Sequence, residues 1–167
     1  MNSRLIVLQK FLTKNNLEAV IIKKPENIYY FSGFTGSTGM LLLTKKGEYL
    51  LTDFRYIEQA GSEASNYKII NCVKSVYNSI IEIIEQDNVS NVGFEGDSFT
   101  FNDYSKLNKL KKTLKFKNIT LDELRSIKDD EEIFNIKKAV EIADKAFTHI
   151  LNFAKPGITE VELAVEL

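Results

Sequence analysis

The chain has 167 residues, of which 44% are hydrophobic and 27% charged, and its 22 basic and 23 acidic residues leave a net charge of −1. A chain of this length buries roughly 70% of its unfolded surface, so its core needs no disulfide or metal, and the composition excludes an intrinsically disordered chain. The small net charge gives no field that attracts nucleic acid or an anionic membrane, and a single cysteine, Cys72, excludes an internal disulfide framework and a cysteine zinc cage.

Targeting signals are missing from the sequence. The N-terminus lacks the apolar run and the small-residue cleavage site of a signal peptide, and no apolar run approaches the roughly 20 residues of a membrane span. We therefore expect a cytoplasmic protein with neither a membrane nor a nucleic acid as partner. The single histidine, His149, leaves the chain poorly equipped for catalysis alone.

Helical and strand patterns alternate over the first 122 residues. The first helix is predicted to follow Ser3 as its N-cap and to end at Asn15 and Asn16, and Asp53 is predicted to cap a helix that ends at Gly61. Another helix face is marked by Tyr104, Leu107, Leu110 and Leu114. Strands are predicted at residues 19–22, 40–43, 49–52, 67–70 and 89–94, with a last one near 114–116. This alternation predicts an α/β domain with a mixed sheet of about five to six strands flanked by helices.

The pattern becomes purely helical from Lys128 and continues for about seven turns. Acidic residues crowd its first turn, Pro156-Gly157 ends it, and Thr159 with Glu162 forms a capping box that opens another helix. The sequence ends within that second pattern. We therefore expect an N-terminal domain at 1–122, a linker at 123–128, and the first helices of a second, truncated domain at 129–167. Their apolar stripe is expected to pack on the N-terminal domain or to form a dimer.

Two polar segments are candidate sites. The glycine-rich stretch 33–39 is not a G-x-G-x-x-G motif, and a predicted strand follows it where a phosphate-binding loop needs a helix, so tight turns are favoured over a nucleotide loop. Residues 52–56, TDFRY, lie where a strand meets a helix, which is a usual place for site residues in α/β folds. The alternative is structural, with Asp53 as a cap and Arg55 as a solvated residue.

Other charged residues favour structural interpretations. His149 has Glu141 and Asp144 as acidic neighbours and no second ligand at metal spacing. The lysines between 106 and 117 fit the solvated face of a helix. The acidic residues Glu95, Asp97 and Asp103 have no recognised cation-binding spacing. We therefore assign neither a catalytic nor a metal-ligating residue to this chain.

Four segments resemble a known family. Residues 25–37, PENIYYFSGFTGS, resemble the P-x-N-I-x-Y-L-T-G-F-x-G-S stretch of Xaa-Pro peptidases, and residues 52–60, TDFRYIEQA, resemble their T-D-x-R-Y-x-x-Q-A stretch. Residues 124–139 look like the junction into the catalytic domain, and residues 155–160 are similar to a turn near its start. The motifs span nearly the whole chain in the order of the creatinase, aminopeptidase P and prolidase family, and they lean toward aminopeptidase P or a bacterial Xaa-Pro dipeptidase.

The resemblance implies a creatinase N-terminal domain-like fold, followed by the long helix that begins a pita-bread domain. It implies that the parent protein is a metallopeptidase that cleaves before proline in short proline-containing peptides, with two divalent ions, manganese or cobalt, in the domain beyond this chain. This chain alone would be inactive. By the same analogy, the N-terminal domain serves homodimer contacts and closes the substrate pocket, with Asp53, Arg55 and Tyr56 and the loop residues Phe34 and Ser37 as candidates. Arg55 would supply a cation to a carboxylate.

Two alternatives stay open beside this expectation. The chain could be a peptide- or protein-binding module of a pita-bread relative that has lost its metal ligands, or, less in keeping with its motifs, a nucleotide-binding α/β domain. Downstream sequence separates the first alternative from the peptidase, and equilibrium dialysis with ATP or NAD tests the second.

Overall fold

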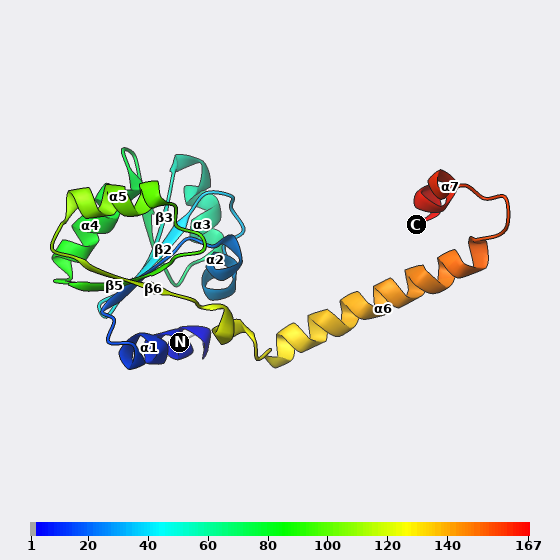
Figure 1. Ribbon diagram of the computed structural model, residues 1–167, viewed down its shortest axis with the longest axis horizontal. Helices are drawn as coiled ribbons and strands as arrows, with labels where there is room; N and C mark the ends of the chain where they lie inside the picture. The colour runs from blue at the N-terminus through cyan, green and yellow to red at the C-terminus, as the bar shows by residue number, and fades with distance from the viewer. Residues whose placement is uncertain (1–2) are drawn as a thin grey trace. The chain divides into compact units, whose positions relative to one another are not determined.

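The computed structural model describes residues 3–167 and divides the chain into two compact units, the first ending at Arg125 and the second spanning Ser126–Leu167. The first unit is a three-layer α/β/α domain (Figure 1). Its strands are β1 (Ala19–Ile22), β2 (Met40–Thr44), β3 (Glu48–Thr52), β4 (Lys68–Asn71), β5 (Asn91–Glu95) and β6 (Lys115–Ile119). Its helices are α1 (Ser3–Lys14), α2 (Pro25–Ser32), α3 (Ile57–Glu63), α4 (Val76–Gln86) and α5 (Phe101–Leu110), with the 3-10 turns η1 (Phe54–Tyr56) and η2 (Asp122–Arg125).

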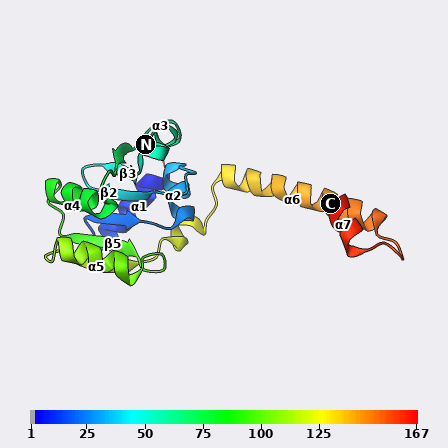
Figure 2. The ribbon, with the colours of Figure 1, turned by 90° about the horizontal axis from the view of Figure 1, so that it is seen from above.

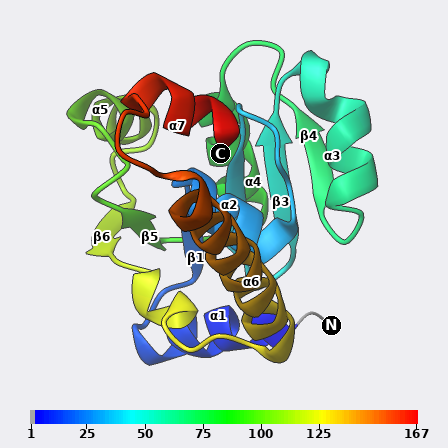
Figure 3. The same ribbon diagram turned by 90° about the vertical axis from the view of Figure 1, so that its right-hand side faces the viewer.

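The six strands form one mixed sheet in the order β4-β3-β2-β1-β5-β6, so that β4 and β6 lie at opposite sides of the domain (Figure 3). Strand β2 is antiparallel to both of its neighbours, and the other adjacent pairs are parallel. The carboxyl ends of five strands and the start of β2 therefore share one edge, called here the carboxyl edge. The sheet confirms the α/β fold expected from the sequence.

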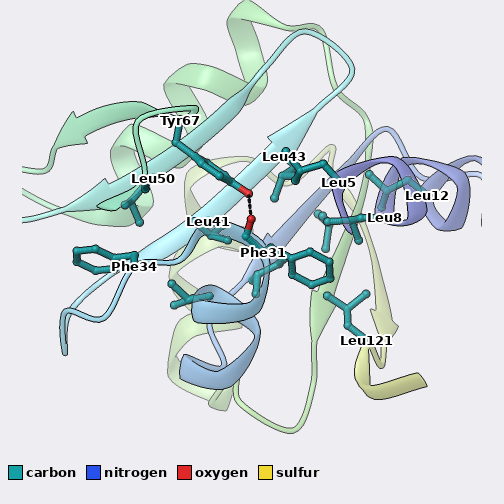
Figure 4. Close-up of a cluster of buried hydrophobic side chains, with 14 of the residues drawn as sticks. Leu5, Leu8, Leu12, Phe31, Phe34, Leu41, Leu43, Leu50, Tyr67 and Leu121 are labelled. Carbon is teal, nitrogen blue, oxygen red and sulfur yellow. Dashed lines mark hydrogen bonds between the residues drawn. The ribbon is translucent and has the colours of Figure 1, made fainter. Parts of the chain in front are cut away.

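The central strands are buried on both faces because their residues alternate between two hydrophobic clusters. Val20, Leu41 and Leu50 face one cluster, which includes side chains of α1, α2 and α3 (Figure 4). Ile21 and Leu42 face the other, which includes side chains of α4 and α5. Figure 4 shows the Tyr67 hydroxyl donating to the Phe31 carbonyl at 3.0 Å, which satisfies a buried polar group inside the first cluster.

Several element boundaries differ from the sequence expectation. Gly61 lies inside α3, which continues to Glu63, because the helical backbone tolerates a glycine when its neighbours hold the turn. Leu114 lies in the turn after α5 and is buried there, whereas Leu110 at the helix end is 47% exposed. Ser3 is the first residue of α1 rather than a residue before it. A helix end is the least certain part of a periodicity argument, since one apolar residue can be buried from a turn as well as from a helix.

The second unit consists of α6 (Asp130–Phe153) and α7 (Glu160–Glu166). Both helices begin with capping boxes. The box of Thr159 with Glu162 was expected from the sequence, and the structure adds one of Asp129 with Glu132. The chain reverses between them, and α7 runs back beside the end of α6 (Figure 2). The sequence suggested Asp144 and Glu141 as partners of His149, but its Nε2 lies 2.6 Å from the Glu166 carboxylate of α7, which only the reversal of the chain brings near.

Across residues 3–167, the helices fall short of the combined length and hydropathy that a bilayer crossing needs.

Candidate functional site at the carboxyl edge

The five candidate residues from the sequence gather at the carboxyl edge of β2 and β3. Residues 34–39 lead into β2, and Asp53 directly follows β3. Because these strands are antiparallel neighbours, the start of one lies beside the end of the other. The Thr52 hydroxyl donates to the Thr38 carbonyl at 2.5 Å and joins the two segments.

Asp53 and Arg55 form a bidentate ion pair. Asp53 is the N-cap of η1 and accepts from the Arg55 backbone N–H at 3.0 Å. The guanidinium donates to the same carboxylate from Nε at 2.9 Å and from Nη2 at 2.7 Å. The Arg55 side chain lowers the pKa of Asp53, and Asp53 in turn raises the pKa of Arg55. The Arg55 cation is therefore already shared with Asp53, while its Nη1 makes no hydrogen bond within residues 3–167 and can still reach a ligand.

Tyr56 ties the loop to η1. Its hydroxyl lies 2.7 Å from the Ser37 hydroxyl, and its ring meets the buried Phe34 ring edge-to-face with centroids 6.0 Å apart. Gly36 passes so close that a Cβ there would lie 2.8 Å from the Tyr56 ring and closer still to Phe34. The absence of a side chain at Gly36 allows this packing, so the loop is held against the aromatic pair and is not an open phosphate cradle.

Helix α3 anchors the other end of the loop. Glu63 accepts from the Thr35 backbone N–H at 2.7 Å and from the Thr35 hydroxyl at 2.8 Å. Gln59 donates to the Thr35 hydroxyl and to Glu63 at 2.9 and 3.0 Å. Hydrogen bonding by the Thr35 backbone lowers the pKa of Glu63, so the anchor is a carboxylate at neutral pH. The loop therefore has a fixed shape before any ligand arrives.

A cavity of about 590 Å³ opens beside this loop. One part of its wall is the segment from Thr35 to Met40, and the rest of the wall is formed by Lys23, Pro25, Ile28 and Ser98. Ligand pockets in proteins commonly measure a few hundred to a thousand Å³. Its lining combines hydroxyl groups, apolar side chains and one ammonium group, which suits a small amphiphilic ligand.

A buried polar network supports the Lys23 wall. Glu95 Oε2 accepts from the backbone N–H groups of Lys23 and Lys24 at 2.9 and 3.0 Å, and its other oxygen accepts from the Asn27 side chain. Burial raises the pKa of Glu95 against the lowering effect of these bonds. Asp103 accepts from Lys23 Nζ at 2.5 Å.

Opposing effects act on Asp103. Its burial raises its pKa, but the hydrogen bonds from Lys23, Tyr77 and Thr100 outweigh this and hold the pKa below its usual range. Asp103 is therefore ionised at neutral pH. Sequence reasoning missed Lys23 and this network; the available signal was the pair of lysines directly after a buried strand, at the edge where α/β sites lie.

A dinuclear metal site does not fit the donor set of residues 3–167, which contain no group of three His, Cys, Asp or Glu side chains placed to hold an ion. The buried carboxylates Glu95 and Asp103 are occupied by backbone and lysine donors. His149 contacts the single carboxylate of Glu166. We therefore derive no catalytic step through a metal on these residues.

Comparison with known proteins identifies the family. Residues 4–127 match the creatinase/prolidase N-terminal domain model, and the chain belongs to this family. An uncharacterized peptidase from Bacillus subtilis, YqhT, is 33% identical over 162 residues, which make up 96% of this chain and 46% of that protein. The chain spans about half the length of the curated relatives it matches.

Solved structures agree with this assignment. The Xaa-Pro dipeptidase from Bacillus anthracis superposes with a TM-score of 0.88 at 30% identity, over 98% of this chain and 46% of that one. The N-terminal domain of the cytoplasmic peptidase PepQ from Mycobacterium tuberculosis matches with a TM-score of 0.69 at 27% identity, over 75% of this chain and 100% of that domain. The chain is thus an N-terminal domain of the Xaa-Pro peptidase family.

Proposed function

We propose that this chain is the non-catalytic N-terminal domain of a metal-dependent Xaa-Pro dipeptidase or aminopeptidase P, acting in the cytoplasm on the peptide bond before proline. The Xaa-Pro dipeptidases from Pyrococcus furiosus and Bacillus anthracis are about twice as long as the stretch that matches this chain. The two divalent ions, manganese or cobalt, would be held by residues outside this chain.

The role proposed for this domain is to close the substrate pocket and to hold a homodimer. The observation that carries it is that the 34–39 loop lines a ligand-sized cavity and is held to Tyr56 through Ser37 and to the end of β3 through Thr52. Asp53 and Arg55 directly follow that strand, outside the cavity lining. Residues pinned by this many hydrogen bonds provide a preformed wall, and a preformed wall lowers the entropic cost of holding a short peptide. Arg55 Nη1 remains available to a peptide carboxyl or carbonyl group.

The pocket role is tested with Arg55→Ala in the protein made from the complete reading frame. Because solvent weakens a charge-assisted hydrogen bond made by an exposed guanidinium, we expect KM for Ala-Pro to rise by about 10-fold at most, with little change in kcat. The matched control is Lys111→Ala, which removes a cation paired with Glu85 between α4 and α5 and should leave KM unchanged. An unchanged KM in the Arg55 variant would contradict the pocket role.

The competing assignment is a peptide- or protein-binding module on a relative without catalytic ligands. It predicts that the complete protein binds proline-containing peptides without cleaving them. Assays of Ala-Pro hydrolysis in the presence of manganese separate the two assignments, because only the peptidase would give a measurable kcat.

A further inference from the structure

We propose that the cavity beside the 34–39 loop binds the C-terminal carboxylate of a short peptide and that the Lys23 ammonium is its cation. The choice of a peptide rests on the proposed function; the choice of a carboxylate rests on the contacts of Lys23.

Lys23 is fixed at both of its ends. Its backbone N–H donates to the buried Glu95 at 2.9 Å, and its Nζ donates to the buried Asp103 at 2.5 Å. A free lysine side chain loses much rotamer freedom when it binds a ligand, and a lysine that is already held loses little. The network therefore presents the ammonium to the cavity in one position.

The ammonium has donors to spare. Three N–H bonds are available on Nζ, and within residues 3–167 the group makes only the hydrogen bond to Asp103. The Lys23 side chain is 28% exposed and lines the cavity. The Phe99 ring, whose centroid lies 5.7 Å from Nζ, makes a cation–π contact that is weaker than a charged hydrogen bond to a ligand oxygen. Two donors thus remain for a carboxylate.

The charge of the site selects a single negative charge. Asp103 also accepts from the Tyr77 hydroxyl at 2.5 Å and from the Thr100 backbone N–H at 2.8 Å, so its charge does not depend on Lys23 alone. Lys23 and Asp103 together carry no net charge. A monoanion can gain the spare ammonium donors, whereas a phosphate dianion would meet stronger repulsion from the Asp103 carboxylate.

The remaining lining matches the body of a peptide that ends in proline. The cavity offers apolar contact from Pro25, Ile28 and Met40, and its lining also includes the hydroxyl-bearing residues Ser37 and Ser98. A pyrrolidine ring has no N–H to satisfy once it is acylated, so an apolar surface beside one cation suits N-acyl proline.

The test is a chemical-shift titration of the 15N-labelled 167-residue chain with N-acetyl-L-proline, N-acetyl-L-prolinamide and inorganic phosphate. We expect shifts at Lys23, Ser37 and Ser98, with the acid binding about 10-fold more tightly than the amide and more tightly than phosphate. The Lys23→Gln variant should lose this preference, while Lys23→Arg should keep it. The matched control Lys24→Gln, whose cation pairs with Asp97 and Asp122 away from the cavity, should bind as the unmodified chain does.

Equal binding of acid and amide, stronger binding of phosphate, a preference that survives Lys23→Gln, or no shift at about 50 mM acid would each overturn the proposal. No metal and no turnover enter this measurement. Failure of the complete protein to cleave Ala-Pro would therefore contradict the proposed function. The carboxylate site would still be tested independently by the titration.

Discussion

Glu95 is a buried carboxylate that connects β5 to the turn after β1 at the carboxyl edge. It is 1% exposed, it accepts two backbone N–H groups from the turn after β1, and it contacts Asn27, which is itself fully buried. The Asn27 side-chain oxygen has no hydrogen-bond partner within residues 3–167. A buried acid beside an unpartnered amide oxygen is well placed to take up a proton, because an O–H at this position could donate to the Asn27 oxygen after the amide rotates.

The pKa of Glu95 gives a pH-dependence with a definite sign. Because burial raises its folded-state pKa above the ordinary 4.5, the folded protein keeps the proton where the unfolded chain has released it. Its contribution to the free energy of unfolding therefore falls as pH rises from about 4.5 through the folded-state value. Glu95→Gln should remove this dependence, since the introduced amide accepts the same backbone bonds and carries no charge.

Urea unfolding of both proteins from pH 4 to 8 measures this difference. The Glu95→Gln variant should gain stability relative to the parent chain as pH rises. The control Glu95→Ala should lose about 2 kcal/mol or more at every pH because the two backbone N–H groups lose their acceptor. A stability difference between Glu95→Gln and the parent chain that does not change with pH would contradict the assigned pKa shift.

The 34–39 loop is an element whose shape depends on one glycine. A Cβ at Gly36 would press on the Tyr56 ring and on the buried Phe34 ring, so Gly36→Ala should destabilise the domain by about 1–3 kcal/mol and displace the aromatic pair. The matched control is Gly61→Ala in α3, where a Cβ meets no atom within 4 Å and the better helix former should add about 0.5–1 kcal/mol. Thermal unfolding of both variants measures the contrast, and a Gly36→Ala chain as stable as its parent would show that the loop is not held as described.

Elements built from local patterns could be predicted from the sequence. The apolar runs of β1 and β2 predicted strands, and the capping box of α7 appears in the structure as the sequence has it. Gly61 misled the prediction because a glycine's effect on a helix depends on its neighbours rather than on its own type. The alternation of strands and helices was enough to predict the fold class, because the hydrophobic pattern of each strand or helix is complete within about ten residues.

The candidate site was only half predictable. The motif residues around Ser37 and Arg55 could be singled out because each lies in a short stretch with a recognisable pattern. Lys23 meets Glu95 and Asp103 across 72 and 80 residues of chain, and only the parallel pairing of β1 with β5 brings them together. No local pattern encodes such a contact, so a lysine after a strand could not be distinguished from a solvated one.

At the scale of the whole molecule, α6 bears on the proposed homodimer. Its apolar residues at helical spacing remain accessible, with exposed fractions of 49% at Ile136, 51% at Val140 and 63% at Phe147. Stripes of this kind usually bind another surface. We expect the chain to sediment as a dimer and the double variant Ile136→Ser, Val140→Ser to sediment as a monomer.

Analytical ultracentrifugation over a range of concentrations measures this assembly, with Lys137→Ser as a control that removes a polar side chain from the same turn. A parent chain that stays monomeric at about 100 μM, well above the dissociation constants usual for homodimers, would contradict a dimer formed through this helix.

The central claim is that this chain is the non-catalytic half of an Xaa-Pro peptidase. It is tested most directly by comparing hydrolysis of Ala-Pro by the 167-residue chain and by the protein made from the complete reading frame, both with manganese and with Ala-Ala as the control peptide. The account predicts that the complete protein cleaves Ala-Pro and spares Ala-Ala, and that the 167-residue chain cleaves neither. Cleavage of Ala-Pro by the 167-residue chain would contradict the account. So would a complete protein that binds Ala-Pro and does not cleave it.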